Sequence, residues 1–335
     1  MSKKNKHRRR TPTRSPVRTP VQDRTLAIED RRFPDNMSFK GKEDYRIQAE
    51  SLPPDPADAP ARLGRSQLIE LIDRLSERDF EILLTLKQSK YLLTGQVQRL
   101  HIPVTATYAT AMQNTVNNMR KLRKLGLVKT FDRRIGGVRA GSSSFVWCLT
   151  EAGQRLLDLK ECVEPIGRSH RYLEPSYAHM KHTLAIAECY VQLIEISRKH
   201  KDILLQTIEW EPDCWRPYQH DGHAMQLKPD LAVVTRNAGY IDRWFIEIDM
   251  NTEAIPVIVE KCKRYHQYLN TGIEQRQHKG VFPIPVWIVV DDDRKQKIIS
   301  AIKDNFKKTP HMFVVIKSEE FESLIRNGAK PEQLY

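Results

Sequence analysis

Apolar residues recur at helical spacing between residues 66 and 160, and they predict a small helical domain with one hairpin. Ser76 and Asp79 have the spacing of a capping box, which predicts the start of a first helix that continues to about Lys90. The other elements expected here are helices at 94–101, 105–125 and 151–159 and strands at 128–133 and 144–149. Three helices followed by a hairpin is the order of a winged helix-turn-helix domain.

Threonines and one glycine are expected to set the ends of these helices. Thr94, Thr105 or Thr107, and Thr150 each precede a helical pattern and are the expected N-caps. Gly126 follows the last helical position of the third helix and is expected to stop it.

The third predicted helix has an apolar side and a polar side. Its expected core stripe consists of Ala109, Met112, Val116, Met119 and Leu122. Its opposite face carries Gln113, Asn114, Asn117, Arg120, Lys121 and Lys124. Asn and Gln side chains can pair with adenine edges, and Arg with guanine edges, in the major groove. This face is therefore the expected DNA-reading surface; the alternative is an ordinary solvated helix face.

The charge of this stretch favours the DNA interpretation. Between residues 82 and 150 a single acid, Asp132, faces eleven basic side chains. Solvated faces usually mix both signs, whereas an excess of cations is suited to phosphates. Arg133 ends the first of these strands, and Arg134 and Arg139 fall in the glycine-containing loop that follows it. We expect all three to contact duplex DNA.

The formal net charge of +13 is distributed unevenly over the 335 residues. Residues 1–65 and 66–160 each carry +7, and residues 161–335 carry −1. We expect 1–65 to be a disordered basic arm with a Pro-rich linker, 66–160 the winged helix domain, and 161–335 a second domain. Scattered cysteines without a Cys-x-x-Cys pair, and no apolar run of about 20 residues, predict a cytoplasmic protein that does not enter a membrane.

Helical and strand patterns alternate in the second half of the chain, which predicts an α/β domain. A long helix is expected at 178–198, followed by strands at 203–210, 231–235 and 240–248. After these come helices at 254–269, 295–307 and 319–326, alternating with strands at 286–290 and 312–316.

Acidic residues mark the second and third of these strands. Asp230 begins one strand, and Glu247 and Asp249 lie near the end of the next, where alternation places them on one face. Converging carboxylates are typical Mg²⁺ ligands, and Glu188 on the long helix is a further candidate. A bound Mg²⁺ could activate water against a phosphodiester. Without a metal, the same carboxylates would form ion pairs with lysines such as Lys261 in a docking domain.

Pro229-Asp230 and Glu247 resemble the PD-(D/E)xK nuclease superfamily, whose pattern is Pro-Asp on one strand and Glu-x-Lys on the next. The resemblance implies a restriction-endonuclease-like core and a Mg²⁺-dependent endonuclease. The lysine position of the pattern holds Asp249 here, and Lys261 on the following helix is the candidate replacement. The candidate catalytic residues are Asp230, Glu247, Asp249 and Lys261, and the candidate metal ligands are Asp230, Glu247 and Glu188.

The order of these pieces resembles the replication-relaxation family of bacterial plasmids and integrative elements. The resemblance is carried by residues 75–83, 122–128 and 149–153, by Lys-Pro-Asp at 228–230, and by Glu-Ile-Asp-Met-Asn-Thr-Glu at 247–253 with Lys261 and Tyr265. It implies an accessory protein that binds duplex DNA in replication or mobilisation of the element. Its second domain would recruit a replication or mobilisation protein, or a second copy in a homodimer. An endonuclease and a transcriptional regulator are the alternatives.

Overall fold

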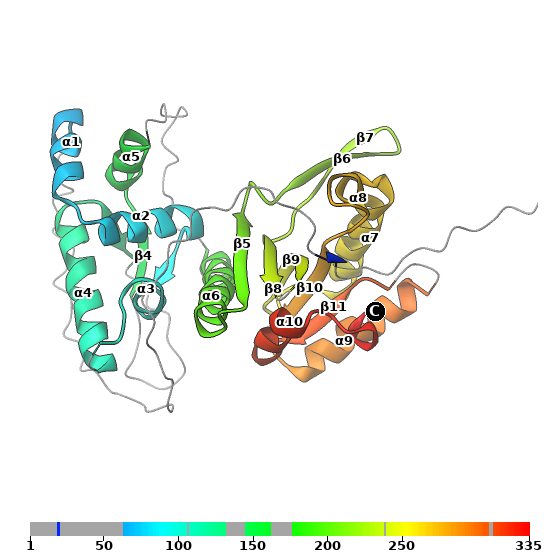
Figure 1. The fold of residues 1–335 in the computed structure, drawn as a ribbon. Helices are drawn as coiled ribbons and strands as arrows, with labels where there is room; N and C mark the ends of the chain where they lie inside the picture. Colours follow the sequence, from blue (N-terminus) through cyan, green and yellow to red (C-terminus); the bar gives the residue numbers. More distant parts are fainter. Residues whose placement is uncertain are drawn as a thin grey trace, which may run out of the picture. The chain divides into compact units, whose positions relative to one another are not determined.

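The computed structural model describes residues 63–105, 107–131, 145–161, 176–237, 239–307 and 311–335, together with the two-residue strand β1 (Thr19–Pro20). These residues fall into two compact units (Figure 1). The first unit contains the described residues from 63 to Lys199, and the second contains β1 and His200–Tyr335. Both units mix helices and strands, so the predicted α/β class is confirmed.

The first unit arranges helices around a small antiparallel sheet. Its helices are α1 (Arg65–Arg74), α2 (Glu77–Ser89), α3 (Thr94–His101), α4 (Tyr108–Lys124), α5 (Glu151–Lys160) and α6 (Tyr177–Lys199). Its strands are β2 (Leu92–Leu93), β3 (Val128–Thr130) and β4 (Val146–Leu149), in the spatial order β2–β4–β3. From α2 to α5, the chain therefore runs helix, strand, helix, helix, strand, strand, helix, and α6 follows.

Side-chain caps fix most of the helix ends where the sequence predicts them. The backbone N–H of Ser76 donates to Asp79 at 2.8 Å and the Ser76 hydroxyl accepts from the Asp79 N–H, so the predicted capping box is confirmed. Thr107 and Thr150 accept from the third residue of α4 and α5, respectively. Gly126, with a φ of +72°, follows the end of α4 in the left-handed conformation that glycine adopts without strain.

Thr94 is not the cap that the sequence predicts. It is the first residue of α3, and its hydroxyl accepts a 2.9 Å hydrogen bond from the indole N–H of Trp147 on β4. Trp147 is fully buried among Leu83, Leu122 and other apolar residues of the first unit. A buried indole needs an acceptor, and Thr94 supplies it.

Helix α6 belongs to the first unit, which differs from the boundary expected near residue 160. Its Ala187 and Val191 are buried in the same core as α2 and α4. Arg99 of α3 adds ion pairs to Glu188 at 2.6 Å and to Glu195 at 2.5 Å. The apolar stripe that the sequence shows on this helix therefore completes the N-terminal core, and the division falls after Lys199.

The second unit is built on one mixed sheet with the strand order β11–β10–β9–β8–β5, and β1 also pairs with β9. Its strands are β5 (Ile203–Trp210), β6 (Arg216–His220), β7 (His223–Leu227), β8 (Leu231–Asn237), β9 (Tyr240–Asp249), β10 (Ile284–Val289) and β11 (Val314–Lys317). Its α-helices are α7 (Ile255–Thr271), α8 (Ile273–Gln277), α9 (Asp292–Asn305) and α10 (Phe321–Asn327). The strands β5, β8 and β9 run antiparallel, whereas β9, β10 and β11 run parallel.

Alternate residues of β9 face the helices α7 and α9. Phe245 packs against Tyr265 of α7, and Glu247 and Asp249 bond to side chains of α7 and α9. The predicted placement of Glu247 and Asp249 on one face of the strand is therefore confirmed. This face also contains much of the apolar core of the unit, including the buried Trp287.

Several elements were not expected from the sequence, among them the short strands β1 and β2. The hairpin β6–β7 turns at Asp221 and Gly222, whose φ angles of +49° and +78° suit a two-residue turn. Its strands carry few β-branched residues, so the pattern gave no strand signal. Helix α1 and the five-residue helix α8 were also missed, because short amphipathic segments carry little periodicity.

Several predictions concern residues outside those described. One is the basic arm and linker expected at residues 1–65, of which only β1 and residues 63–65 are described. Another is the wing, whose Arg133, Arg134 and Arg139 lie outside the described residues. Within the described ranges, every helix is too short or too polar to cross a lipid bilayer.

Candidate functional site

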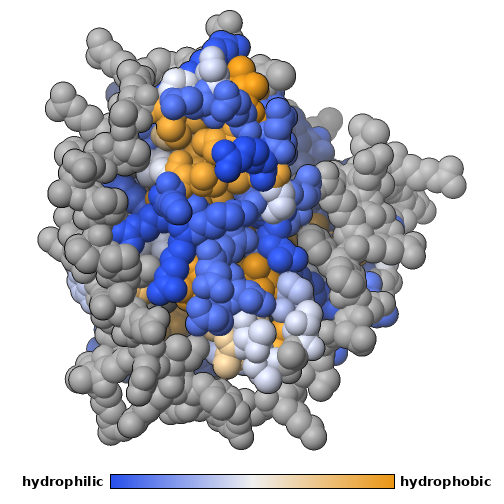
Figure 2. All heavy atoms as spheres, turned by 90° about the vertical axis from the view of Figure 1, so that its left-hand side faces the viewer, coloured by the Kyte–Doolittle hydropathy of each residue, from blue (hydrophilic) through white to orange (hydrophobic). Residues whose placement is uncertain are grey.

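The polar side of α4 forms an exposed surface of the first unit. Its exposed side chains are Gln113, Asn114, Asn117, Lys121 and Lys124, and Arg120 is half-buried. The amide of Gln113 donates to Asn117 at 3.1 Å, which orients the two side chains together. Figure 2, which views the molecule from the side of α4, shows a hydrophilic band across the middle of this face. The residues predicted to read DNA thus share one solvent-facing surface.

The buried side of α4 differs from the expected stripe. Ala111, Thr115, Met119 and Leu122 are buried, whereas Ala109 is exposed. Thr115 can be buried because its hydroxyl donates to the carbonyl of Ala111 at 2.8 Å. Because threonine is polar, the predicted stripe leaves out Thr115. The predicted stripe therefore lies part of a turn away from the side of α4 that is buried.

Lys121 holds a buried carboxylate. Its Nζ lies 2.5 Å from Oδ2 of Asp79, whose side chain has no exposed surface, whereas the Lys121 side chain is 49% exposed. Burial alone would raise the pKa of Asp79, but the hydrogen bonds from Lys121 and Ser76 outweigh it and lower the pKa. Because Asp79 also caps α2, this pair fastens α4 to the start of α2. Lys121 therefore positions the polar face of α4 in addition to belonging to it.

The second cluster of interest centres on Glu247, a carboxylate buried in the second unit. The hydroxyl of Tyr265 donates to its Oε1 at 2.7 Å, and Nζ of Lys261 donates to its Oε2 at 3.1 Å. Both donors lie on α7, one helical turn apart. Lys261 also lies 3.8 Å from Glu253 in the connection between β9 and α7. The predicted partnership of Glu247 and Lys261 is present as an ion pair.

Asp230 and Asp249 are engaged in different ways. Asp230 Oδ2 accepts a 2.7 Å hydrogen bond from the backbone N–H of Ile248, which fixes the start of β8 beside the end of β9. Asp249 accepts two hydrogen bonds from the guanidinium of Arg294, at 2.6 Å and 3.0 Å. Arg294 also donates to the carbonyl of Glu253 at 2.6 Å. Through Arg294, Asp249 therefore anchors the connection between β9 and α7. The partner of Asp249 in these bonds is Arg294 and not Lys261.

Burial dominates the electrostatics of Glu247. It raises the pKa of the carboxyl to about 7, with Asp230 acting in the same direction and Lys261 and Tyr265 opposing it. The pKa of Lys261 is raised: burial would lower it, but the neighbouring carboxylates prevail. A cavity of about 30 Å³ beside them is lined by Glu247, Lys261, Tyr265, Leu227, Lys228 and Arg264. That volume suits a water molecule and not an organic ligand.

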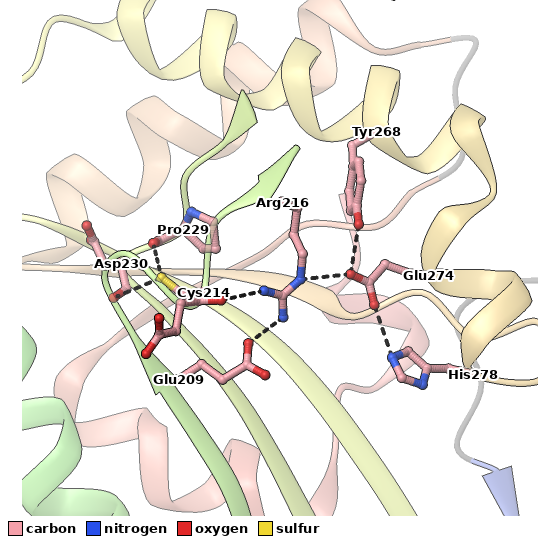
Figure 3. Close-up of polar contacts among 9 residues, drawn as sticks. Glu209, Cys214, Arg216, Pro229, Asp230, Tyr268, Glu274 and His278 are labelled. Atoms are coloured by element: carbon pink, nitrogen blue, oxygen red, sulfur yellow. Dashed lines mark hydrogen bonds and ion pairs between the residues drawn. The ribbon is translucent and has the colours of Figure 1, made fainter. Parts of the chain in front are cut away.

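A polar network supports the segment around Asp230 (Figure 3). The Cys214 thiol donates to the carbonyl of Pro229 at 3.0 Å, and burial raises the pKa of Cys214 to about 12. Arg216 pairs with Glu209 and with the buried Glu274. These ion pairs of Arg216 join the hairpin β6–β7 to α8 and β5. The buried Cys214 thiol holds the backbone just before Asp230.

The carboxylates, as they are arranged, do not fit a Mg²⁺ ion. The oxygens of Glu247 and Asp249 already accept hydrogen bonds from side chains, and Asp230 is bonded to the backbone, whereas Mg²⁺ demands octahedral oxygen coordination. Glu188, the third predicted ligand, lies on α6 in the first unit, where it pairs with Arg99. Within the described residues, no group of three or more His, Cys, Asp or Glu side chains is placed to hold a metal ion.

Comparison with known families decides the relationship of the chain. A model of the replication-relaxation family matches residues 83–284, which is more than half of the sequence. The chain belongs to the replication-relaxation family. The match includes the α4 face and the Glu247 cluster, so this family member carries both within the shared region. Searches of curated proteins and of solved structures gave no match.

Two side chains that bond to the acidic residues of this replication-relaxation protein are absent from the predicted site. Tyr265 belongs only to the family motif in the prediction, although it lies four residues after Lys261 and so shares its helix face. Arg294 had no signal, because it meets Asp249 only when α9 packs beside β9. The partnership of Lys121 with Asp79 was also missed, since 42 residues separate them in the sequence.

We expect Lys121→Ala to lower the free energy of unfolding of this protein by about 1–2 kcal/mol, because the substitution leaves the Asp79 carboxylate buried without its cation. Lys124→Ala, a matched change one turn on, should stay within about 0.5 kcal/mol of wild type. Urea unfolding at pH 7 measures both. The lowered pKa of Asp79 means that its contribution is present above its ordinary value of 3.8 and is lost as pH falls through the folded value. The Lys121→Ala deficit should therefore shrink in acid, and equal stability of the two variants at pH 7 would contradict the assignment.

Glu247→Gln should remove a pH-dependent part of the stability. The folded pKa of about 7 exceeds the ordinary 4.5, so the contribution of Glu247 is fully present below pH 4.5 and is lost as pH rises toward 7. Relative to Glu247→Gln, wild type should lose up to about 3 kcal/mol over this range. Lys261→Met removes the opposing cation and should extend the loss to higher pH. Urea unfolding between pH 4.5 and 8 is the measurement, and a constant difference between wild type and Glu247→Gln would refute it.

Proposed function

We propose that this protein is an accessory factor in replication or mobilisation of a plasmid or integrative element, and that it binds duplex DNA through α4. The first unit would be a winged helix domain, with α4 as its recognition helix and the segment between β3 and β4 as its wing. The observation that supports this best is the α4 surface, where amides and cations are exposed together without an exposed acid. The replication role follows from the family.

The order and pairing of elements support the winged helix assignment. Helix α3 leads into α4, and the following strands β3 and β4 pair with the short β2 in the order β2–β4–β3. In winged helices the second helix of the pair enters the major groove. The exposed Gln113, Asn114 and Asn117 lie in the first three turns of α4, and Lys124 lies in its last turn. We assign base contacts to the amides and phosphate contacts to Lys124.

The second unit is proposed to recruit a partner protein of the replication or mobilisation machinery. Its buried charges are paired within the fold: Glu247 with Lys261, and Asp249 with Arg294. These pairs hold the connection between β9 and α7 in place. The arrangement favours a docking role over metal chemistry.

Two α4 variants should separate the two kinds of DNA contact. Lys124→Ala should weaken binding to a mixed-sequence duplex and reduce the slope of log affinity against log salt by about 0.9, the value for one phosphate contact. Asn117→Ala should leave that slope unchanged while weakening selection among duplex sequences. Lys297→Ala removes an exposed cation from α9 and is the matched control. Fluorescence anisotropy across a salt series measures all three, and an unchanged slope in Lys124→Ala would exclude this docking mode.

A metal-dependent endonuclease is a second candidate function, because Asp230, Glu247 and Lys261 do converge in the second unit. Supercoiled plasmid incubated with the protein and Mg²⁺ or Mn²⁺ distinguishes the two. We expect the plasmid to stay supercoiled, since the carboxylate oxygens are bonded to protein donors. Metal-dependent nicking that disappears in Asp230→Ala would establish the endonuclease instead. Asp230→Ala purified in the same way controls for contaminating nucleases.

A further inference from the structure

Helix α1 has an exposed apolar side chain at its centre. Ile69 is 48% exposed, although Leu68 and Leu71 on the other side of the helix are buried against the core. Ile72, one turn further, is only partly buried. In Figure 2 apolar atoms gather in the upper part of the face, at the height of α1, above the hydrophilic band.

The charges around Ile69 are symmetric and opposite in sign. Arg65 lies four residues before it and Asp73 four residues after it, so both share its helix face, one turn to either side. Both side chains are exposed, and within the described residues neither has a hydrogen bond or an ion pair.

Both charges oppose the helix that carries them. Arg65 is the first residue of α1, and Asp73 lies in its last turn. The helix dipole favours acids at the N-terminal end and bases at the C-terminal end, so each residue has the unfavourable sign for its position. Within the described residues neither of these two side chains has a partner that offsets its placement, which points to a demand from outside the first unit.

We propose that α1 is a self-docking helix through which two copies of this chain associate. Two α1 helices packed antiparallel about Ile69 bring the Arg65 of each copy level with the Asp73 of the other, and Ile69 meets Ile69. A parallel pair would set Arg65 against Arg65 and Asp73 against Asp73, so the charges select the antiparallel arrangement. Each copy then presents its own α4, as dimeric DNA-binding proteins do on paired half-sites.

The size of the helix sets the expected strength. Ten residues of helix are about 15 Å long, which gives an interface well below the roughly 1,600 Å² of a standard stable complex. Association is therefore weak and concentration-dependent, with a dissociation constant on the order of hundreds of micromolar.

Charge exchange across the helix pair tests the proposal. Sedimentation equilibrium of the full chain, from about 1 to about 500 µM, should show mass rising above the monomer value of 39.1 kDa. Arg65→Asp and Asp73→Arg should each weaken association about tenfold, by placing like charges together. The double variant should return to within about threefold of wild type. That restoration also excludes unfolding of α1 as the cause, since the exchanged charges suit the helix dipole.

Two further variants complete the test. Ile69→Ser should abolish association. Glu70→Arg makes the same charge change as Asp73→Arg on a different side of α1 and should leave association unchanged. A mass that stays monomeric over the whole range, or a double variant weaker than both single variants, would overturn the proposal. The experiment contains no DNA, so its outcome is independent of the proposed DNA binding.

Discussion

The pairing of Asp79 with Lys121 joins the start of α2 to the polar face of α4. A carboxylate with no exposed surface caps α2 and at the same time receives the ammonium group of α4. Separating such a pair leaves a buried charge, which costs far more than the pair itself contributes. The orientation of α4 relative to α2 is therefore fixed by a contact on the edge of the very face proposed to read DNA. A recognition helix must present its side chains at a defined angle, and this contact defines it.

The second unit uses the same device. Glu247 is enclosed by a lysine and a tyrosine from α7, and Asp249 by an arginine from α9, so charged pairs fix both helices to the end of β9. In each unit a lysine or arginine from a packed helix neutralises an acid at the end of another element. The sequence carries the nuclease-like motif, but donors within the fold already occupy the oxygens of these carboxylates.

The sequence predicted local features well and long-range ones poorly. The capping box at Ser76, the caps at Thr107 and Thr150 and the shared face of Glu247 and Asp249 follow from spacing alone, and the structure confirms them. The prediction that Thr94 is an N-cap and the predicted core stripe of α4 were wrong, because both depend on the hydrogen-bond partner of a buried threonine. The partner of Thr94 is Trp147, and that of Thr115 is the carbonyl of Ala111. The packing of α6 in the first unit and the pairing of Lys121 with Asp79 join segments that are far apart in the sequence. Hydrophobic periodicity describes one segment at a time and does not predict which segments meet.

Mapping the DNA-contacting surface directly is the most decisive test of DNA binding through α4. Ultraviolet crosslinking of the full chain to a duplex, followed by mass spectrometry of the attached peptides, shows which residues lie against DNA. If α4 is the recognition helix, crosslinks concentrate on α4 between Gln113 and Lys124 and on the segment between β3 and β4. Crosslinks confined to the unit from His200 to Tyr335 would contradict it, because DNA would then be bound without the proposed recognition helix.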